Sequence, residues 1–307
     1  MIQYLLRRLA ITIPVIYGLI TLVFFMMHLL PGDAVQVMLT EFAASAKDQE
    51  VLRHNLGLDR PLLVQYVDYV WALMHGDFGR SLFSHQAVMS QIGNQLPATM
   101  QLACASMLIA VPIGILVGIA AAVRQNGWVD RVSMVGSLFG VAMPNFWLGL
   151  VFIYVFAVML NWLPAAGSGS LKQLILPAVS LAAYPIAVLA RLVRASMLEV
   201  LRQEYVVTAR SRGVSERGVI FRHALKNALI PVITVAGMQF GFALGGAVIT
   251  ETVFARQGIG QLAVAAIQQR DMPLVQGTVI VVGIITILAN LLVDIVYGLI
   301  DPRIRYS

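Results

Sequence analysis

The sequence predicts an all-α integral membrane protein with six transmembrane helices, a small helical cap on the outer face and a helical loop in the cytoplasm. Hydrophobic residues make up 59% of the 307 positions and charged residues 12%, and the mean hydropathy of +0.82 lies outside the soluble range. Six windows lack Asp, Glu, Lys and Arg and are long enough, at about 18 residues or more, to cross a bilayer as helices. They are residues 10–30, 101–123, 132–160, 173–190, 227–250 and 272–293. These continuous apolar runs lack the alternation of barrel strands, so a helical bundle is predicted.

Charge predicts the orientation of the bundle. Six helices place both termini on one side, and 14 of the 21 Lys and Arg residues fall in the segments on that side, which the positive-inside rule assigns to the cytoplasm. The net charge of +6 is explained by basic helix ends beside anionic headgroups and requires no nucleic-acid partner. The first apolar window is longer than the core of a signal peptide, so we expect a retained anchor. The one cysteine, Cys104, excludes an intramolecular disulfide and a cysteine-based metal site.

Three regions follow from this plan: residues 1–30 as tail and first transmembrane helix, 31–98 as an outer cap loop, and 99–307 as a five-helix core. In the cap, apolar spacing predicts helices over 51–58 and 62–74, with Gly57 and Gly76 as stops. Four aromatic residues lie close together at the end of the cap, and they favour contact with the bundle or another protein over a passive linker. They are Tyr66, Tyr69, Trp71 and Phe78.

Prolines and pairs of glycines lie within several of the predicted spans. Pro144 interrupts the third window, and Pro112, Pro177 and Pro185 are expected to kink other helices. Pairs of glycines four residues apart, at 114 and 118 and at 237 and 241, predict close helix packing.

Polar residues near the breaks are the candidates for a translocation path. We select Asn145, Phe146, Gln239 and Phe240, with core packing as the competing role of the two phenylalanines. The acids near span ends, Glu251 and Asp294, are not placed as a midplane proton relay, which disfavours an ion-coupled transporter without excluding it.

The longest basic insert, residues 191–231, is predicted to form a helical elbow. Apolar residues recur at helical spacing from Met197 to Arg212, which indicates one amphipathic helix. Gly213 stands where a left-handed turn would end that helix, and Ser215 with Glu216 would start the next one, which leads into the fifth span. A helix pair resting on the membrane surface is the alternative.

Two runs in this insert resemble the cytoplasmic loop of membrane subunits in bacterial ABC importers: Glu204-Tyr-Val-Val-Thr-Ala-Arg-Ser-Arg-Gly213 and His223-Ala-Leu-Lys-Asn-Ala-Leu-Ile-Pro231. Further matching runs follow in order along the chain. They are Leu30-Pro-Gly-Asp33, Leu56-Gly-Leu-Asp-Arg-Pro61, Gly76-Asp-Phe-Gly79, Gln239-Phe-Gly241 with Glu251, Gly258-Ile-Gly260 and Asp301-Pro-Arg-Ile-Arg305. The whole resembles the dipeptide, oligopeptide and nickel permease family, and within it the first permease of dipeptide or glutathione importers. Val207, Thr208 and Ala209 replace the Glu-Ala-Ala of the general importer loop, which is similar to the peptide branch.

The resemblance implies a transport subunit without catalytic residues or a bound metal. Its elbow would be a coupling helix seated on an ATPase, with coupling residues Glu204, Thr208, Ala209, Arg212, Gly213, Ser215 and Glu216. The chain has no Gly-x4-Gly-Lys-Ser/Thr loop, so ATP and Mg would bind to two separate ATPase subunits. The resemblance further implies a second homologous permease, a periplasmic solute-binding protein that meets the cap, and the bacterial inner membrane as the location.

The expected activity is import of dipeptides or short peptides, with glutathione close behind, by alternating access. Nickel or metal-chelate uptake by an ABC permease is the first alternative. An ion-coupled secondary peptide transporter and a membrane scaffold or sensor without transport remain as further alternatives.

Overall fold

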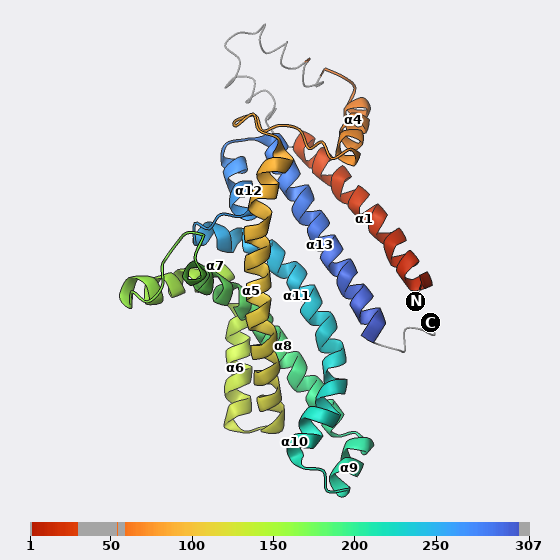
Figure 1. Cartoon of the computed structure of the whole chain (residues 1–307), viewed down its shortest axis with the longest axis vertical. Helices are drawn as coiled ribbons and strands as arrows, with labels where there is room; N and C mark the ends of the chain where they lie inside the picture. The colour runs from red at the N-terminus through yellow and green to blue at the C-terminus, as the bar shows by residue number, and fades with distance from the viewer. Residues whose placement is uncertain (1, 30–53, 55–58, 301–307) are drawn as a thin grey trace.

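The computed structural model describes residues 2–29, 54 and 59–300, and in these the chain is helical apart from short connections (Figure 1). The α-helices are α1 (Ile2–Leu29), α4 (Leu62–Met74), α5 (Val88–Val123), α6 (Trp128–Ala142), α7 (Asn145–Phe152), α8 (Leu171–Leu201), α9 (Glu204–Ser211), α10 (Glu216–Gly218), α11 (Leu225–Val253), α12 (Ile259–Gln268) and α13 (Met272–Ile300). Two π-helical segments, η1 (Ile153–Met159) and η2 (Val219–Ala224), continue α7 and precede α11. The expected cap helix over 51–58 lies outside the described residues.

Five helices are long and apolar enough to cross a membrane, and the bent pair formed by α6 with α7 and η1 makes a sixth candidate span. The pair bends by 104° at the break, where Pro144 has no N–H to donate and Met143 is held in extended backbone before it. The predicted interruption at Pro144 is therefore confirmed, and the second half of the window, residues 145–159, turns sideways from the first at this break. Pro112, Pro177 and Pro185 lie within the continuous helices α5 and α8.

The bundle centres on α5, α8 and α11. Gly118 of α5 lets the two backbones approach, because a Cβ at this position would lie 2.6 Å from the Cβ of Val193 and 2.7 Å from the carbonyl oxygen of Ala190. Buried side chains of the three helices, including Leu189 and Met197, form one apolar cluster in the half of the bundle nearest the elbow. The predicted close packing at the glycine pair of α5 is confirmed.

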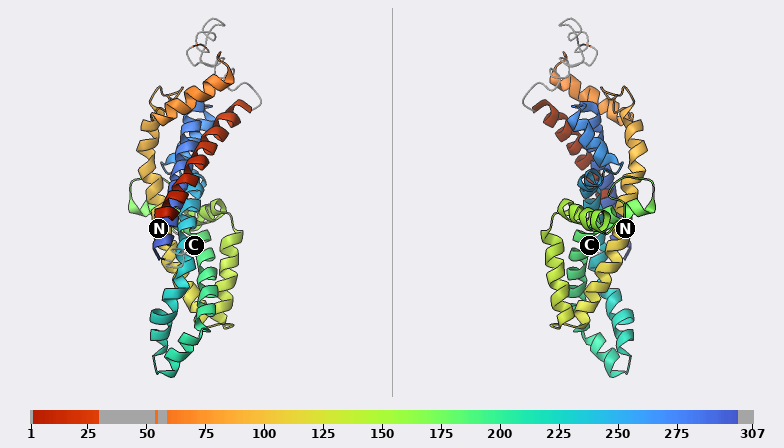
Figure 2. Two further views of the ribbon diagram at one scale, coloured as in Figure 1. Left: turned by 90° about the vertical axis from the view of Figure 1, so that its right-hand side faces the viewer. Right: turned by 90° about the vertical axis from the view of Figure 1, so that its left-hand side faces the viewer.

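α1 and α13 lie side by side and run in opposite directions, so that the start of α1 lies near the end of α13 (Figure 1). An ion pair of 2.7 Å joins Arg8 to Asp294 near those ends. The side views place α4 and the α9–α10 elbow at opposite ends of the long axis (Figure 2).

Helix α4, predicted as part of the cap, packs on the carboxy-terminal half of α1 through aromatic side chains. Tyr66 contacts Tyr17, Phe24 and Phe25, and its hydroxyl lies 2.6 Å from Thr21 Oγ1. Tyr69 contacts Phe24, and burial raises its pKa. The expected contact between the cap and the bundle is thus confirmed for these residues. α4 ends at Met74 as predicted, and Gly76 follows with a φ of +78°.

A buried polar cluster ties α5, α11 and α12 together at the end of the bundle far from the elbow. The carboxylate of Glu251 accepts hydrogen bonds from Thr99 Oγ1 (2.7 Å) and from the N–H of Gly260 (2.8 Å). Arg256 donates to Gln101 Oε1 at 2.8 Å, and burial lowers the pKa of this guanidinium. Glu251 is fully buried, and its hydrogen bonds join α11 to α5 and α12, which is the arrangement of a structural residue and not of a proton relay.

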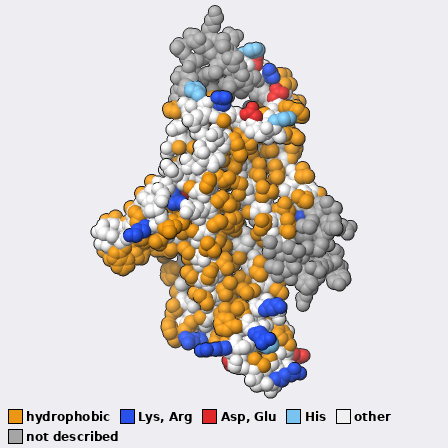
Figure 3. Space-filling view, in the orientation of Figure 1, with side chains coloured by type: hydrophobic (Ala, Val, Ile, Leu, Met, Phe, Trp, Pro, Cys, Tyr) orange, Lys and Arg blue, Asp and Glu red, His pale blue; other side chains and the backbone are white. Residues whose placement is uncertain are grey.

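The surface matches a membrane-embedded body with water-facing ends. Apolar side chains cover the middle of the molecule, while Lys and Arg gather at the elbow end and charged side chains of both signs at the α4 end (Figure 3).

α5 begins at Val88, upstream of the predicted start at 101, so the boundary drawn between cap and core at 98 falls inside this helix.

Candidate functional site

The first candidate site is the elbow formed by the end of α8, α9, α10 and η2. The single helix predicted from Met197 to Arg212 is wrong, because α8 ends at Leu201 and α9 starts at Glu204. Gln203 between them has an extended backbone (φ −71°, ψ 146°). The break turns α9 away from the axis of α8 and produces a separate short helix at the tip of the molecule.

Gly213 ends α9 in the left-handed turn that the sequence predicts. Its φ is +78°, its N–H donates to the carbonyl of Arg210 (2.9 Å), and the N–H of Val214 donates to the carbonyl of Ala209 (3.2 Å). This pair of bonds is the Schellman arrangement, which satisfies the last carbonyls of a helix. A Cβ at Gly213 would have no atom within 4 Å, so only the backbone conformation requires glycine here.

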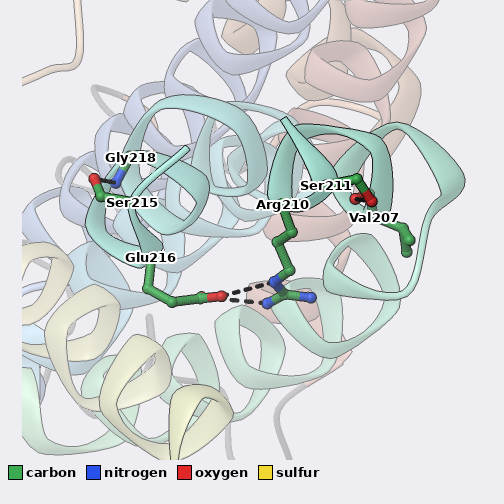
Figure 4. Close-up of polar contacts among 6 residues, drawn as sticks. All are labelled: Val207, Arg210, Ser211, Ser215, Glu216 and Gly218. Atoms are coloured by element: carbon green, nitrogen blue, oxygen red, sulfur yellow. Dashed lines mark hydrogen bonds and ion pairs between the residues drawn. The ribbon is translucent and has the colours of Figure 1, made fainter. Parts of the chain in front are cut away.

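Side chains close the elbow on both sides of this turn (Figure 4). Arg210 on α9 and Glu216 on α10 point toward one another and form a two-bond ion pair of 2.8 and 3.4 Å. Ser215 caps α10 by accepting from the N–H of Gly218 at 3.4 Å, as the sequence predicts. The two short helices are therefore held at a defined angle.

The predicted coupling residues divide into an outer and an inner set. Those with exposed side chains or backbone are Glu204, Thr208, Arg212, Gly213, Ser215 and Glu216. Ala209, together with Val206, is buried inside the elbow, where α9 contacts α8 and η2. Ala209 therefore supports α9 from within and does not offer its side chain to the outside.

The outer face of the elbow combines positive charge with exposed apolar side chains. Between residues 199 and 226 the chain carries six exposed basic and three exposed acidic residues. Tyr205, Val207 and Phe221 are 42%, 52% and 56% exposed beside them. Apolar side chains on a charged, water-facing loop are typical of a surface that another protein covers.

Several contacts join the elbow to the bundle. The side-chain amide of Asn227, at the start of α11, donates to the hydroxyl of Tyr205 on α9 at 2.7 Å. Near the end of α8, Arg194 forms a two-bond ion pair with Asp130 of α6 (2.5 and 2.7 Å), and Asp130 is 3% exposed. The elbow is thus continuous with α8 and α11, and α8 is bonded to the bent span.

The second candidate site is a cavity of about 240 Å³ beside the Pro144 break. It is lined by Asn145 of α7, by Leu181, Tyr184 and Pro185 of α8, and by Gln239, Phe242 and Ala243 of α11. Gln239 is 5% exposed, and its Oε1 atom is buried without a hydrogen-bond partner. Two of the four predicted path residues, Asn145 and Gln239, therefore meet at one cavity.

The two predicted phenylalanines do not line this cavity. Phe240 packs against the buried apolar clusters of α5, α8 and α11, and Phe146 is 45% exposed on the surface of α7. Tyr184 and Phe242 take their places in the wall. Neither was selected from the sequence, since an aromatic residue in a long apolar run carries no signal of the helix face on which it lies.

Among the described residues, no group of three His, Cys, Asp or Glu side chains could hold a metal ion.

The chain belongs to the family of binding-protein-dependent transport system inner membrane components, which it matches over residues 114–306. Residues 1–103 match the amino-terminal part described for the same transport-system membrane components. The protein is accordingly a permease subunit of an inner membrane transport system.

Relatives at similar distance share the full length of the chain. It is 42% identical to the di/tripeptide transport system permease protein DppB of Pseudomonas aeruginosa, covering 100% of both chains. It is 43% identical to the dipeptide transport system permease protein DppB of Alkalihalophilus pseudofirmus and 42% identical to the glutathione transport system permease protein GsiC of Escherichia coli K12, again with full coverage of both chains.

Among solved structures, the fold is similar to a chain of the inward-facing MetNI methionine ABC transporter. The TM-score is 0.58 at 18% identity, and the likeness covers 69% of this chain and 97% of the other. A chain of an amino acid ABC transporter crystallised with histidines is similar with a TM-score of 0.53 at 16% identity, covering 70% of this chain and 94% of the other. At these identities the likeness establishes the fold.

Proposed function

We propose that this chain is one permease subunit of an ATP-binding cassette importer that moves dipeptides or other short peptides, with glutathione among them, across the bacterial inner membrane. The observation that carries the proposal is the identity of 42–43% over the full length to proteins named as dipeptide, di/tripeptide and glutathione permeases. Both chain termini lie in the cytoplasm in this proposal, on the side of the basic elbow.

Energy for transport comes from two partner ATPase subunits, which bind ATP and Mg. The chain itself contains no phosphate-binding loop of the Gly-x4-Gly-Lys-Ser/Thr form. The elbow is the coupling helix: the exposed residues Glu204, Thr208, Arg212, Gly213, Ser215 and Glu216 face the ATPase, while Ala209 holds α9 from inside. The exposed apolar residues and the surplus of basic charge on this loop support such a docking role.

Movement of the elbow is transmitted to the path through α8 and α11. α8 is continuous with the elbow through Leu201 and is bonded to α6 by the Asp130–Arg194 pair, while η2 joins α10 directly to α11. The cavity lies between these helices and the α6–α7 break. When the ATPases approach one another, the elbows of two permeases would be drawn together and the bundle would change between inward-open and outward-open states.

A second homologous permease and a periplasmic solute-binding protein complete the assembly. Six spans are few for a closed path, and apolar side chains cover much of the bundle surface. On the outer side, α4 exposes a stripe of apolar residues at helical spacing that suits contact with the binding protein or the sister permease. The stripe consists of Leu63, Val67, Trp71 and Met74.

Reconstitution tests this function. The chain, co-expressed with the transport subunits encoded beside it, is placed in proteoliposomes that contain ATP, and uptake of radiolabelled dialanine or glutathione is measured with the loaded binding protein outside. ATP-dependent uptake is expected, and vesicles without ATP are the control. Uptake that follows a proton or sodium gradient without ATP would refute the proposal in favour of secondary transport.

A further inference from the structure

One residue that lines the cavity beside the Pro144 break carries a buried polar atom without a structural explanation. Gln239 lies in the middle of α11 and is 95% buried, yet its Oε1 has no hydrogen-bond partner. A buried acceptor without a donor costs free energy, so such atoms in a folded protein call for a reason other than stability. The atom belongs to a residue that lines a cavity open to a ligand.

A backbone carbonyl of α8 is also left without its helical donor beside the cavity. Pro185 has no N–H, so the carbonyl of Leu181, four residues earlier on α8, lacks its helical donor. Leu181 and Pro185 both line the cavity with Gln239. Residues of α8 and α11 that line one cavity therefore each include a group whose usual hydrogen-bond donor is missing.

The remaining lining defines what kind of donor fits. Phe242, Ala243 and Pro185 are apolar, Asn145 and Tyr184 carry neutral polar groups, and no lining residue is charged. Burial of an ammonium group without a carboxylate would be costly, whereas a neutral amide N–H needs only an acceptor. The Asn145 amide and the Tyr184 hydroxyl can donate to a carbonyl, which a peptide group also supplies.

The size of the cavity limits the occupant to a part of the substrate. A volume of about 240 Å³ corresponds to roughly eight water molecules at about 30 Å³ each. It is smaller than the pockets of about 300–1,000 Å³ that enclose a whole small ligand. One peptide group with one small or apolar side chain fits this space.

We infer that this cavity is a transit subsite for one peptide unit, whose N–H donates to Gln239 Oε1 while its side chain lies against Pro185 and Phe242. The inference rests on the proposed function and adds to it the group that the permease itself recognises. A neutral subsite of this kind recognises the backbone common to all peptides and tolerates different side chains, which suits a permease fed by a binding protein.

The test compares two substitutions on α11 that both remove a buried polar atom. Gln239→Met removes the acceptor in the cavity and keeps the length of the side chain. Thr234→Val is the matched control, because Thr234 Oγ1 is also buried without a partner but lies outside the cavity lining. Both variants are studied in the complete transporter in proteoliposomes, with radiolabelled dialanine and saturating loaded binding protein, together with thermal unfolding of the purified complex.

We expect Gln239→Met to lower dialanine uptake about three- to tenfold, the loss of one hydrogen bond, while Thr234→Val leaves uptake unchanged. The unfolding temperature of Gln239→Met should equal or exceed that of the wild type, since no internal partner is lost. Equal uptake in the wild type and Gln239→Met would overturn the inference, and so would a lower unfolding temperature, which would make Gln239 structural. If the wild-type complex takes up neither dialanine nor glutathione, the peptide function itself fails.

Discussion

Substitution of Gly213 tests whether the shape of the elbow is what links it to transport. Its φ of +78° lies in the left-handed region, and nothing within 4 Å would meet an added Cβ. The penalty of a side chain therefore comes from the backbone alone: about 1–2 kcal/mol for alanine and up to about 3 kcal/mol for a β-branched residue such as valine. Asparagine, which tolerates this conformation, should cost least.

These energies predict a graded loss of coupling. Since about 1.4 kcal/mol corresponds to a tenfold change in an equilibrium constant, Gly213→Val should lower the equilibrium constant for forming the native turn roughly a hundredfold, and Gly213→Ala about tenfold. The Schellman bonds to Ala209 and Arg210 would be lost with it. Membrane insertion should remain intact, because Gly213 is exposed at the tip of the molecule.

The assay measures peptide transported per ATP hydrolysed by the reconstituted complex. Coupling should fall in the order glycine, asparagine, alanine, valine, while the amount of assembled complex stays constant. Ser211→Val is the matched control, since it adds a β-branched side chain two residues away at an exposed helical position. Normal coupling in Gly213→Val would refute the reasoning, and equal defects in the asparagine and valine variants would show that the backbone conformation is not the cause.

Three further predictions concern stability, measured as thermal unfolding of the purified complex. Asp130→Asn leaves the Arg194 guanidinium without its charged partner and should lower the free energy of unfolding by about 3–5 kcal/mol. Replacing both residues by apolar ones should recover most of this loss, and equal unfolding temperatures for the single and double variants would contradict the prediction. Thr99→Val removes the donor to Glu251 and the acceptor for the N–H of Ile259, the first residue of α12. The free energy of unfolding should fall by about 2–4 kcal/mol. An unchanged unfolding temperature would show that these hydrogen bonds do not hold α12 in place. Tyr69→Phe deletes a buried hydroxyl that has no partner and should be neutral or stabilising; clear destabilisation would reveal a partner for that hydroxyl.

Local signals in the sequence predicted much of this fold. Hydropathy located the five regular spans, because a bilayer imposes a minimum length on any apolar helix. Gly213 and Ser215 located the turn and the cap of the elbow, since each supplies a conformation or a hydrogen bond that few residues can. The end of α4 at Met74 followed from Gly76 in the same way.

Features that depend on tertiary packing could not be predicted. Hydropathy measures the length of an apolar run but not its direction, so the interruption at Pro144 was predicted while its bend of 104° and the π-helical segment η1 were not. The break between Leu201 and Glu204 contains neither glycine nor proline, and the amphipathic period continues across it. The same limit applies to the candidate sites, where two distant elements meet.

The contacts that build the sites join residues far apart in the chain. Asp130 and Arg194 are 64 positions apart in the chain, and only the structure pairs them. Asn145 and Gln239 were selected for their polarity near breaks, and the structure places both at one cavity. Tyr184 of that cavity lies within the apolar run 173–190, so the sequence does not indicate that its side chain faces a cavity.

The most direct test of the central claim is purification of this chain with its assembly partners. The chain is co-expressed with its genomic neighbours, purified through a tag on this chain alone, and the copurifying material is assayed for vanadate-sensitive ATPase activity. The account predicts that a second permease and ATPase subunits copurify with that activity, and that Gly213→Val alters its coupling to peptide. A chain that purifies alone, or with partners that lack ATPase activity, would contradict it.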